Sequence, residues 1–545
     1  MAKNKETIIM IVAILGIIIF GTAIAPIQLQ NDTFYTIKIG QYILENGISQ
    51  YDPFSFHETL PYTFPHWMYD VSMGIIHNIG GMFGVYLSTV GLTVGLAVVW
   101  FIVNCKLHKN KLTSFILALA LLYLMEIYIA ARAQLLTFSI FILEIFFIER
   151  FLTNKKIGYA IGLIVLPAIL ANVHLAVFPF YFILFLPYIG EYAVAVLAET
   201  PNYIRQLKIH DIDKKLRKGK LEEEKKKELE KKAENLQEKI VLSQEKTQRR
   251  RANAYKLKVE KNDNVRWLIL VMVIAMFTGL LTPLGDTPYT YLVKTLQGNT
   301  TQYISEHLPI MLIAAKPQLC LIVIMLAILI FTDTKIRLKD LFLAGGLLLL
   351  ALMSRRQMSM FVIMGLTILN GLIVALVNKY DKDGCTKFIN LMQKPLGIVL
   401  TLALVLVMCI PSVKNKIDDK FIPAEVYPIE ACDYILENLD VENIRIYNEY
   451  NYGSYMIYRG IPVFIDSRAD LYTPEFDYEQ QRDIFSDFIN LSWNYVEVFE
   501  RYDITHILIP VGSGLKNMIA HGKDYTQIYE DEYFCIWEKI ASEVE

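Results

Sequence analysis

The sequence has few of the residues that build metal centres and phosphate-binding loops. It contains six cysteines in 545 residues, and none of them has the spacing of a cysteine–histidine metal site. No glycine-rich nucleotide-binding pattern occurs in its C-terminal part, and the chain has no Ser-His-Asp motif. Its clustered basic residues alternate with acids, unlike a nucleic-acid-binding surface. We therefore expect no zinc module, nucleotide-binding domain, triad hydrolase or nucleic-acid partner.

Charged residues are also nearly absent from the long apolar runs. The sequence is 54% hydrophobic and 20% charged, with a mean hydropathy of +0.36, which is more apolar than a soluble protein of this length needs. About eleven runs have the length of a membrane span. They lie near 7–27, 81–104, 112–130, 134–152, 157–172, 175–197, 266–283, 310–331, 339–354, 358–378 and 395–411. The sequence predicts an α-helical polytopic membrane protein. Its first run is too long for a signal peptide and is not followed by a small-residue cleavage site, so we expect it to be retained as a helix.

Cations are scarce in every second connection between these runs. With a cytoplasmic N-terminus, the basic connections at 106–111, 150–156, 204–265, 335–339 and 379–387 all lie in the cytoplasm. This is the positive-inside pattern. With an odd number of spans, it predicts a multi-pass cell-membrane protein with an extracytoplasmic C-terminal region.

The chain divides into four predicted parts. A transmembrane module (1–203) with a long first outer loop (28–80) is followed by a charged insert (204–265), more transmembrane helices (266–411) and a C-terminal domain (412–545).

The insert is predicted to be a cytoplasmic helical hairpin or short coiled coil. Leu229, Ala233, Leu236 and Ile240 have a/d spacing, and Gly219 is placed to turn one arm onto the other. The hairpin either binds a cytoplasmic partner or is only a solvated insert, and its basic residues could lie near anionic lipid. The sequence leaves these alternatives open.

The C-terminal part is predicted to be a small extracytoplasmic α/β domain. Four short runs read as strands, at 444–448, 462–466, 506–510 and 533–537, and 480–503 reads as helix. Cys432 and Cys535 both lie in this part, where a disulfide is permitted, but the sequence does not show whether they meet. Asp466, Arg468 and Asp470 form either an acceptor-binding loop or, as we favour, an internal salt bridge.

The predicted outer connections each carry an ionisable or strongly hydrogen-bonding side chain. The candidate site residues are Asp32, Arg132, Gln134, Asn172, His174, Glu306, His307, Lys316, Arg355 and Arg356. Each has an ordinary alternative. Asp32 could cap the helix expected at 33–47, Glu306 could pair locally, His174 could be a core histidine, and the two arginines could reach lipid head groups.

These residue types suit transfer from a lipid phosphate. An acid at the membrane surface can act as general base for an incoming hydroxyl or hold a divalent metal. Cations at the same depth suit the phosphate of a lipid carrier, because guanidinium groups bind phosphate oxygens bidentately. Transfer from a lipid phosphate needs both an acid that deprotonates the acceptor hydroxyl and cations that stabilise the leaving phosphate.

Several motifs resemble those of the GT-C superfamily, membrane glycosyltransferases that use polyprenyl-linked sugars outside the membrane. An acid, Asp32, opens a first loop that runs through "DPFSF" and "HWMYD". "RAQLLTF" and "NVH" resemble outer-face motifs of bacterial members. "YISEH" resembles the Ile-x-Glu element of oligosaccharyltransferase catalytic subunits. "NYGSYMIYRGIPVFIDSRADLY" resembles the tail of bacterial membrane proteins with this layout.

The resemblance implies a donor, an acceptor and roles for the acids. The donor would be a polyprenyl-phosphate-linked sugar, and the acceptor a glycan, lipid or protein at the membrane surface. Asp32 would be the catalytic base of an inverting transfer, Glu306 would assist acceptor or metal binding, and Arg355 or Arg356 would contact the lipid phosphate. Asp32 is flanked by Asn31 and Thr33, not by a second carboxylate, so a divalent metal is possible but is not assigned.

Two other functions remain open from the sequence. A lipid-linked saccharide transporter or flippase would show internal repeats, broken helices and polar groups at the membrane midplane. We find no convincing repeat, and the polar groups lie at one end of the spans. A catalytically inactive assembly platform is the second alternative.

Overall fold

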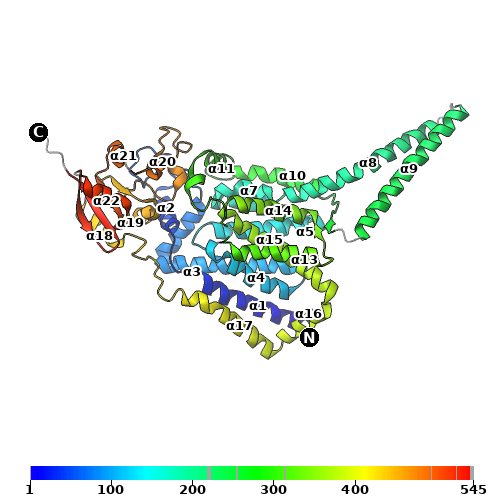
Figure 1. Cartoon of the computed structure of the whole chain (residues 1–545), viewed down its shortest axis with the longest axis horizontal. Helices are drawn as coiled ribbons and strands as arrows, with labels where there is room; N and C mark the ends of the chain where they lie inside the picture. Colours follow the sequence, from blue (N-terminus) through cyan, green and yellow to red (C-terminus); the bar gives the residue numbers. More distant parts are fainter. Residues whose placement is uncertain are drawn as a thin grey trace.

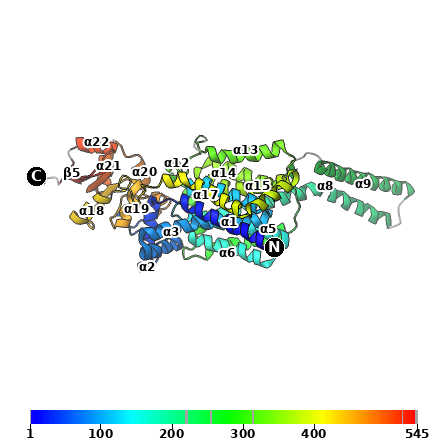
Figure 2. The ribbon, with the colours of Figure 1, turned by 90° about the horizontal axis from the view of Figure 1, so that it is seen from below.

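The computed structural model describes residues 2–217, 222–252, 256–311, 313, 315–492, 494–522 and 524–540, with side chains from Thr7 onward except at 250–252. A helical body lies in the middle of the molecule, the α/β domain at one end and a helical hairpin at the other (Figures 1 and 2). Gly219, the expected turn of the hairpin, lies outside the described residues.

Every apolar run predicted from the sequence is mostly helical in this body. Its main helices are α1 (Ala2–Ile24), α3 (Trp67–His108), α4 (Lys111–Met125), α5 (Gln134–Asn154), α6 (Ile157–Val173), α7 (Phe178–Ile183), the first part of α8 (Leu186–Arg217), α10 (Val265–Met276), α13 (Lys316–Phe331), α14 (Leu338–Met353), α15 (Met358–Tyr380) and α17 (Pro395–Lys414). Helix α3 begins well before the predicted span and contains one break, at Gly81, where φ is 57°. A positive φ of this kind is adopted readily by glycine.

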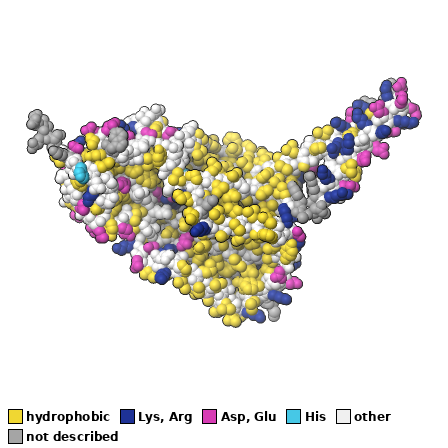
Figure 3. Space-filling model, in the orientation of Figure 1, with side chains coloured by type: hydrophobic (Ala, Val, Ile, Leu, Met, Phe, Trp, Pro, Cys, Tyr) yellow, Lys and Arg dark blue, Asp and Glu magenta, His cyan; other side chains and the backbone are white. Residues whose placement is uncertain are grey.

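The surface of this body is apolar between two charged ends. Figure 3 shows a broad hydrophobic belt that separates the mixed surface of the α/β domain from the charged hairpin. Among the described residues, six helical stretches are long and apolar enough to cross a membrane, and three apolar helices are shorter. The chain is therefore a multi-pass membrane protein, while the number of eleven spans stays a prediction.

The hairpin is formed by α8 and α9 (Glu223–Ala252). Helix α8 runs without interruption from the body into the hairpin, so no break in structure marks the predicted start at residue 204. Ile240 is buried, as is Ile212 on α8, and Asn202 donates to Ser243 at 3.2 Å across the two arms. Of the four predicted a/d positions, Ile240 is buried, while Leu229, Ala233 and Leu236 are partly exposed, so the coiled coil stays a prediction.

The C-terminal domain contains a four-stranded sheet with the order β3-β4-β6-β5. Its strands are β3 (Ile446–Asn448), β4 (His506–Pro510), β5 (Tyr525–Glu530) and β6 (Phe534–Lys539). Its helices are α18 (Ile429–Asn438), α19 (Tyr450–Arg459), α20 (Ile484–Ile489), α21 (Tyr495–Arg501) and α22 (Gly514–His521). Strand β3 is parallel to β4, while β4 and β5 are antiparallel to β6.

Several local predictions for this domain were wrong. Residues 462–466 do not join the sheet, because Val463 bridges Ser55 of the first loop instead. Strand β5 was not predicted, and 480–503 contains two short helices, not one long helix. Cys432 and Cys535 are both buried and free.

The first loop fastens the domain to the helical body. Helix α2 (Asn31–Asn46) packs between α3 and α19, and a Cβ added at Gly40 would lie 1.8 Å from the Asp70 carbonyl oxygen, so only glycine fits there. Arg468 pairs with Asp466 at 2.7 Å and with Asp52 of the first loop at 2.5 Å, all three being buried. The favoured salt bridge is therefore observed, and it extends to a second segment of the chain.

Candidate active site

Two of the predicted acids meet on one arginine, at the end of the body that faces the α/β domain. Arg132 Nη2 lies 2.8 Å from Asp32 Oδ2, and Arg132 Nη1 lies 2.8 Å from Glu306 Oε1. The side chains of Asp32, Arg132 and Glu306 are 19%, 24% and 44% exposed. We call these three residues the acid–arginine cluster. It is partly open to solvent, as a site for an incoming acceptor must be.

Asp32 is held by the start of α2 without capping it. The residue before this helix is Gln30, and no side-chain cap bond is formed. Asp32 lies in the first turn, where the helix dipole favours a negative charge. Thr33, Phe34 and Tyr35 are buried and fix this turn. The capping alternative is thus not observed, and the carboxylate is directed to Arg132.

Arg132 and Glu306 are each fixed through their backbones. Arg132 lies in a buried turn between η1 (Glu126–Tyr128) and α5, where its N–H donates to the Ala130 carbonyl at 2.8 Å. The Glu306 carbonyl accepts from the Arg356 N–H at 3.0 Å and from Ser354 Oγ at 3.2 Å. Glu306 therefore pairs with a residue 174 positions away, not locally.

The charges of the cluster stabilise one another. Burial alone would raise the pKa of Glu306, but Arg132 and Arg356 outweigh it, so that pKa lies below its ordinary value. Burial alone would lower the pKa of Arg132, but Asp32 and Glu306 raise it. Both groups are thus charged at neutral pH.

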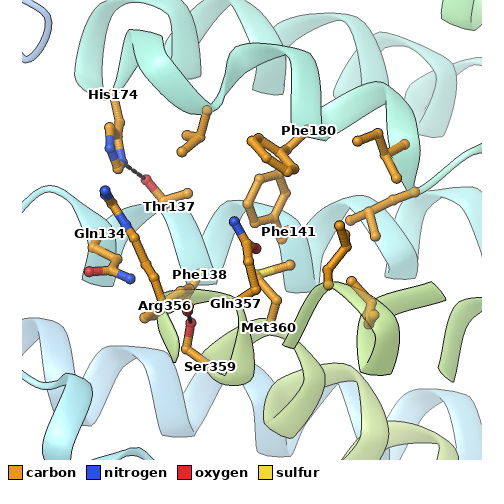
Figure 4. A pocket seen from close by; sticks show the side chains of 15 residues that line it. Gln134, Thr137, Phe138, Phe141, His174, Phe180, Arg356, Gln357, Ser359 and Met360 are labelled. Carbon is orange, nitrogen blue, oxygen red and sulfur yellow. Dashed lines mark hydrogen bonds between the residues drawn. The ribbon is translucent and has the colours of Figure 1, made fainter. Parts of the chain in front are cut away.

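An apolar cavity of about 50 Å³ lies next to the cluster (Figure 4). Gln134, His174 and Arg356 lie together on one side of the cavity, whereas Gln357 lies near Phe141 and Met360 (Figure 4); the lining also includes Phe138, Phe180 and Leu347. The Arg356 side chain extends toward His174 and Thr137. Its guanidinium makes no ion pair and no hydrogen bond with any residue that the structure describes, and so it is available to an anion.

Two neutral histidines lie side by side here, and one of them, His174, lines the cavity. The rings of His66 and His174 lie 4.8 Å apart, and His174 Nδ1 is hydrogen-bonded to Thr137 Oγ1 at 2.9 Å. Burial, together with the nearby charges of Arg356 and Arg132, lowers the pKa of His66 to about 3. The pKa of His174 is also lowered by burial, by His66 and by both arginines. His66 was not selected from the sequence, although the quoted "HWMYD" motif contains it.

The other predicted residues take different places. Asn172 accepts from the Trp67 indole at 3.2 Å and donates to two backbone carbonyls, so it holds the turn before His174. Burial and Arg356 lower the pKa of His307. Arg355 is half-buried, and its backbone carbonyl accepts a hydrogen bond from the Tyr128 hydroxyl. Lys316 is exposed at the start of α13 and contacts none of the cluster residues.

Asp470 joins the domain to the segment before Glu306. It accepts hydrogen bonds from Tyr291 and Thr295 of α11 (Thr287–Gln297) and from Thr300. The distances are 3.2, 2.9 and 2.9 Å. Sequence reasoning missed this contact, because nothing local to either segment indicates it.

The described residues form no group of three or more His, Cys, Asp or Glu side chains able to hold a metal ion. Asp32 and Glu306 are the acids best placed to share one, and a guanidinium already lies between them. With Arg132 in this position, the residues present do not fit a divalent metal.

Comparison with solved structures identifies a similar fold. The archaeal oligosaccharyltransferase AglB from Archaeoglobus fulgidus, solved with an inhibitory peptide and a dolichol-phosphate, matches 93% of this chain and 69% of its own, with a TM-score of 0.51 and 10% sequence identity. No protein-family model and no curated protein sequence matches the chain. The likeness confirms the predicted fold, a GT-C-like helical membrane body with a C-terminal α/β domain.

Proposed function

We propose that the protein is a membrane glycosyltransferase that transfers a sugar from a polyprenyl-phosphate-linked donor to an acceptor on the extracytoplasmic side. The acid–arginine cluster carries the proposal, since it brings together Asp32 and Glu306 beside a cavity with an unpaired guanidinium. The fold supports the same class, because one solved structure with a similar fold is an oligosaccharyltransferase in complex with a dolichol-phosphate.

Asp32 acts as the base in this proposal. The acceptor hydroxyl attacks the anomeric carbon of the sugar while its proton passes to the Asp32 carboxylate. The bond from the anomeric carbon to the phosphate oxygen breaks, and the lipid phosphate leaves with the electron pair. Attack opposite the leaving group inverts the anomeric centre.

The cavity would receive the phosphate end of the donor. Arg356 supplies a charge for the phosphate oxygens, and Gln134 adds a neutral donor beside it. Phe138, Phe141 and Phe180 give the remaining wall an apolar surface that suits the first units of a lipid chain. Arg356 is thus a better candidate for the phosphate than Arg355, which does not line the cavity.

The orientation is part of the proposal. The N-terminal end of α1 and the hairpin lie at one end of the body, and α2, whose first turn carries Asp32, and the α/β domain lie at the other (Figure 1). With basic connections in the cytoplasm, the cluster faces outward, where a donor made inside and flipped would be used.

The test is a reconstituted transfer assay. Purified protein in lipid vesicles receives radiolabelled polyprenyl-phosphate sugars and a membrane extract as the source of acceptors. We expect Asp32→Asn to lower the transfer rate about 100-fold or more. Glu126→Gln is the matched control, because Glu126 lies at the same end of the body and its carboxylate accepts from Ser412, at 3.2 Å, without contacting the acid–arginine cluster among the described residues.

The alternatives give different results. Equal transfer by wild type and Asp32→Asn removes Asp32 from the chemistry. Movement of the labelled lipid across the bilayer without transfer would instead identify a transporter. Protein that neither transfers nor moves the lipid but captures membrane partners would fit an assembly platform.

A further inference from the structure

We propose that Arg132 is a built-in cation that takes the place of a divalent metal between Asp32 and Glu306. The inference deepens the proposed function and rests on it for its catalytic meaning, but the ion-binding property follows from the cluster itself. Metal dependence was left open by the sequence, and the geometry of the cluster decides it.

The guanidinium fills the position that a bridging ion would need. Arg132 Nη2 and Nη1 lie 2.8 Å from oxygens of the two acids. A divalent ion that bound both carboxylates would lie about 2.0–2.6 Å from the same oxygens. It would therefore have to displace the guanidinium, because both cannot approach these oxygens at once.

The formal charge of the surroundings is already balanced without a metal. Asp32 and Glu306 supply two negative charges, and Arg132 and Arg356 supply two positive charges, Arg356 being close enough to lower the pKa of Glu306. A bound divalent ion would leave two positive charges in excess in a partly buried site. Such an excess opposes binding of the ion.

Arg132 is also held so that it does not leave the site readily. Its turn is buried through Ala130, Ala131 and Ala133, and its own side chain is 24% exposed. If the guanidinium moved away, both carboxylates would lose their partner. The structure thus builds the arginine into the cluster as a permanent counter-ion.

Arg132 is accordingly a positioning residue in the proposed reaction. It orients the Asp32 carboxylate toward the acceptor and fixes the Glu306 turn to α5. Arg356 and the neutral hydrogen-bond donors that line the cavity then stabilise the negative charge of the leaving phosphate. Transfer should proceed without added divalent ions, at rates that agree within about twofold with EDTA or with Mn²⁺.

The first test measures Mn²⁺ binding directly, by electron paramagnetic resonance of free Mn²⁺ titrated with the purified full-length protein. We expect wild type to bind no Mn²⁺ at micromolar concentrations. Stoichiometric binding by wild type that is lost in Asp32→Asn and in Glu306→Gln would overturn the proposal. This measurement does not need transfer, so it decides the inference even if the protein proves not to be a transferase.

The second test removes the built-in cation. Arg132→Asp adds a third carboxylate where the guanidinium lay, and we expect it to bind one Mn²⁺ at least tenfold more tightly than wild type. Arg132→Gln removes the positive charge without adding a third carboxylate, so it causes less repulsion among the acids. It replaces Arg132→Asp in this test if that variant does not fold. Lys316→Asp is the matched control, since it makes the same change of charge away from the cluster. Equal Mn²⁺ binding by wild type and by a folded Arg132→Asp or Arg132→Gln would contradict the inference.

Discussion

Arg132 joins three segments that are far apart in the chain. Its guanidinium contacts the first turn of α2 and the turn that contains Glu306, while its backbone belongs to the turn before α5. A bidentate arginine suits this position better than lysine, because its two Nη atoms reach two carboxylates in fixed directions. One side chain thus determines where both predicted acids lie.

His57 gives a pH-dependent stability at the boundary between the first loop and the α/β domain. Its Nε2 donates to the Phe464 carbonyl at 2.8 Å, and burial lowers its pKa to about 4. Below pH 6.5 the unfolded chain binds a proton that the folded chain does not, so stability falls as the pH decreases from 6.5 toward 4. We expect a loss of about 2 kcal/mol between pH 7 and pH 5 from this residue.

The measurement is the thermal unfolding of the detergent-solubilised protein at pH 7 and pH 5. His57→Gln keeps a donor near the Phe464 carbonyl without titrating in this range. The decrease in apparent Tm on acidification should be smaller in this variant than in wild type. An identical decrease in both proteins would show that His57 does not control the acid sensitivity.

At the scale of elements, the hairpin of α8 and α9 buries few side chains between its two arms. Ile240 is 3% exposed, whereas its neighbour Val241 is 44% exposed on the same helix. Most other side chains of α9 are solvated, and this accounts for its high content of Lys and Glu. The seam at Ile240 holds the two arms together, because little else is buried between them.

Ile240→Asp should open this seam, while Val241→Asp should leave it closed. Burying a carboxylate at the 3% exposed position of Ile240 is unfavourable, but the exposed position of Val241 tolerates one. Limited trypsin digestion is a sensitive measurement, since the hairpin is rich in Lys and Arg. We expect Ile240→Asp to be cleaved in the hairpin several-fold faster than wild type and Val241→Asp. Equal cleavage rates would show that Ile240 does not hold the arms together.

The docking of the α/β domain is a second feature at this scale. Arg468, which also pairs with Asp466, binds Asp52 of the first loop, and Asp470 accepts hydrogen bonds from the α11 segment. The loop "FIDSRADLY" therefore contacts both of the segments that carry the acids Asp32 and Glu306. These contacts join the domain to the two segments that carry the acids of the cluster.

For the whole molecule, the hydrophobic belt of Figure 3 separates two ends that would lie in different compartments. The proposed orientation is checked by labelling single cysteines in intact cells with a membrane-impermeant maleimide. Glu437→Cys lies on the exposed surface of the domain, and Glu228→Cys on the exposed surface of the hairpin. Both are made in a chain whose own cysteines are replaced.

We expect Glu437→Cys to be labelled in intact cells and Glu228→Cys only after permeabilisation. This result follows if the basic connections are retained in the cytoplasm. The reverse result would place the acid–arginine cluster in the cytoplasm. It would then exclude a donor used on the extracytoplasmic side.

The sequence alone determined the features that depend on local patterns. Long apolar runs become helices because a membrane leaves the backbone few other ways to satisfy its hydrogen bonds, and a/d spacing indicated that Ile240 would be buried. It also placed Asp32, Glu306 and Arg356 in connections between helices. The tertiary structure alone decided which of these groups meet. The pairing of Arg132 with both acids, the choice of Arg356 over Arg355 for the cavity, and the bridge of Val463 to Ser55 all depend on contacts between distant segments, which no local pattern of residues encodes.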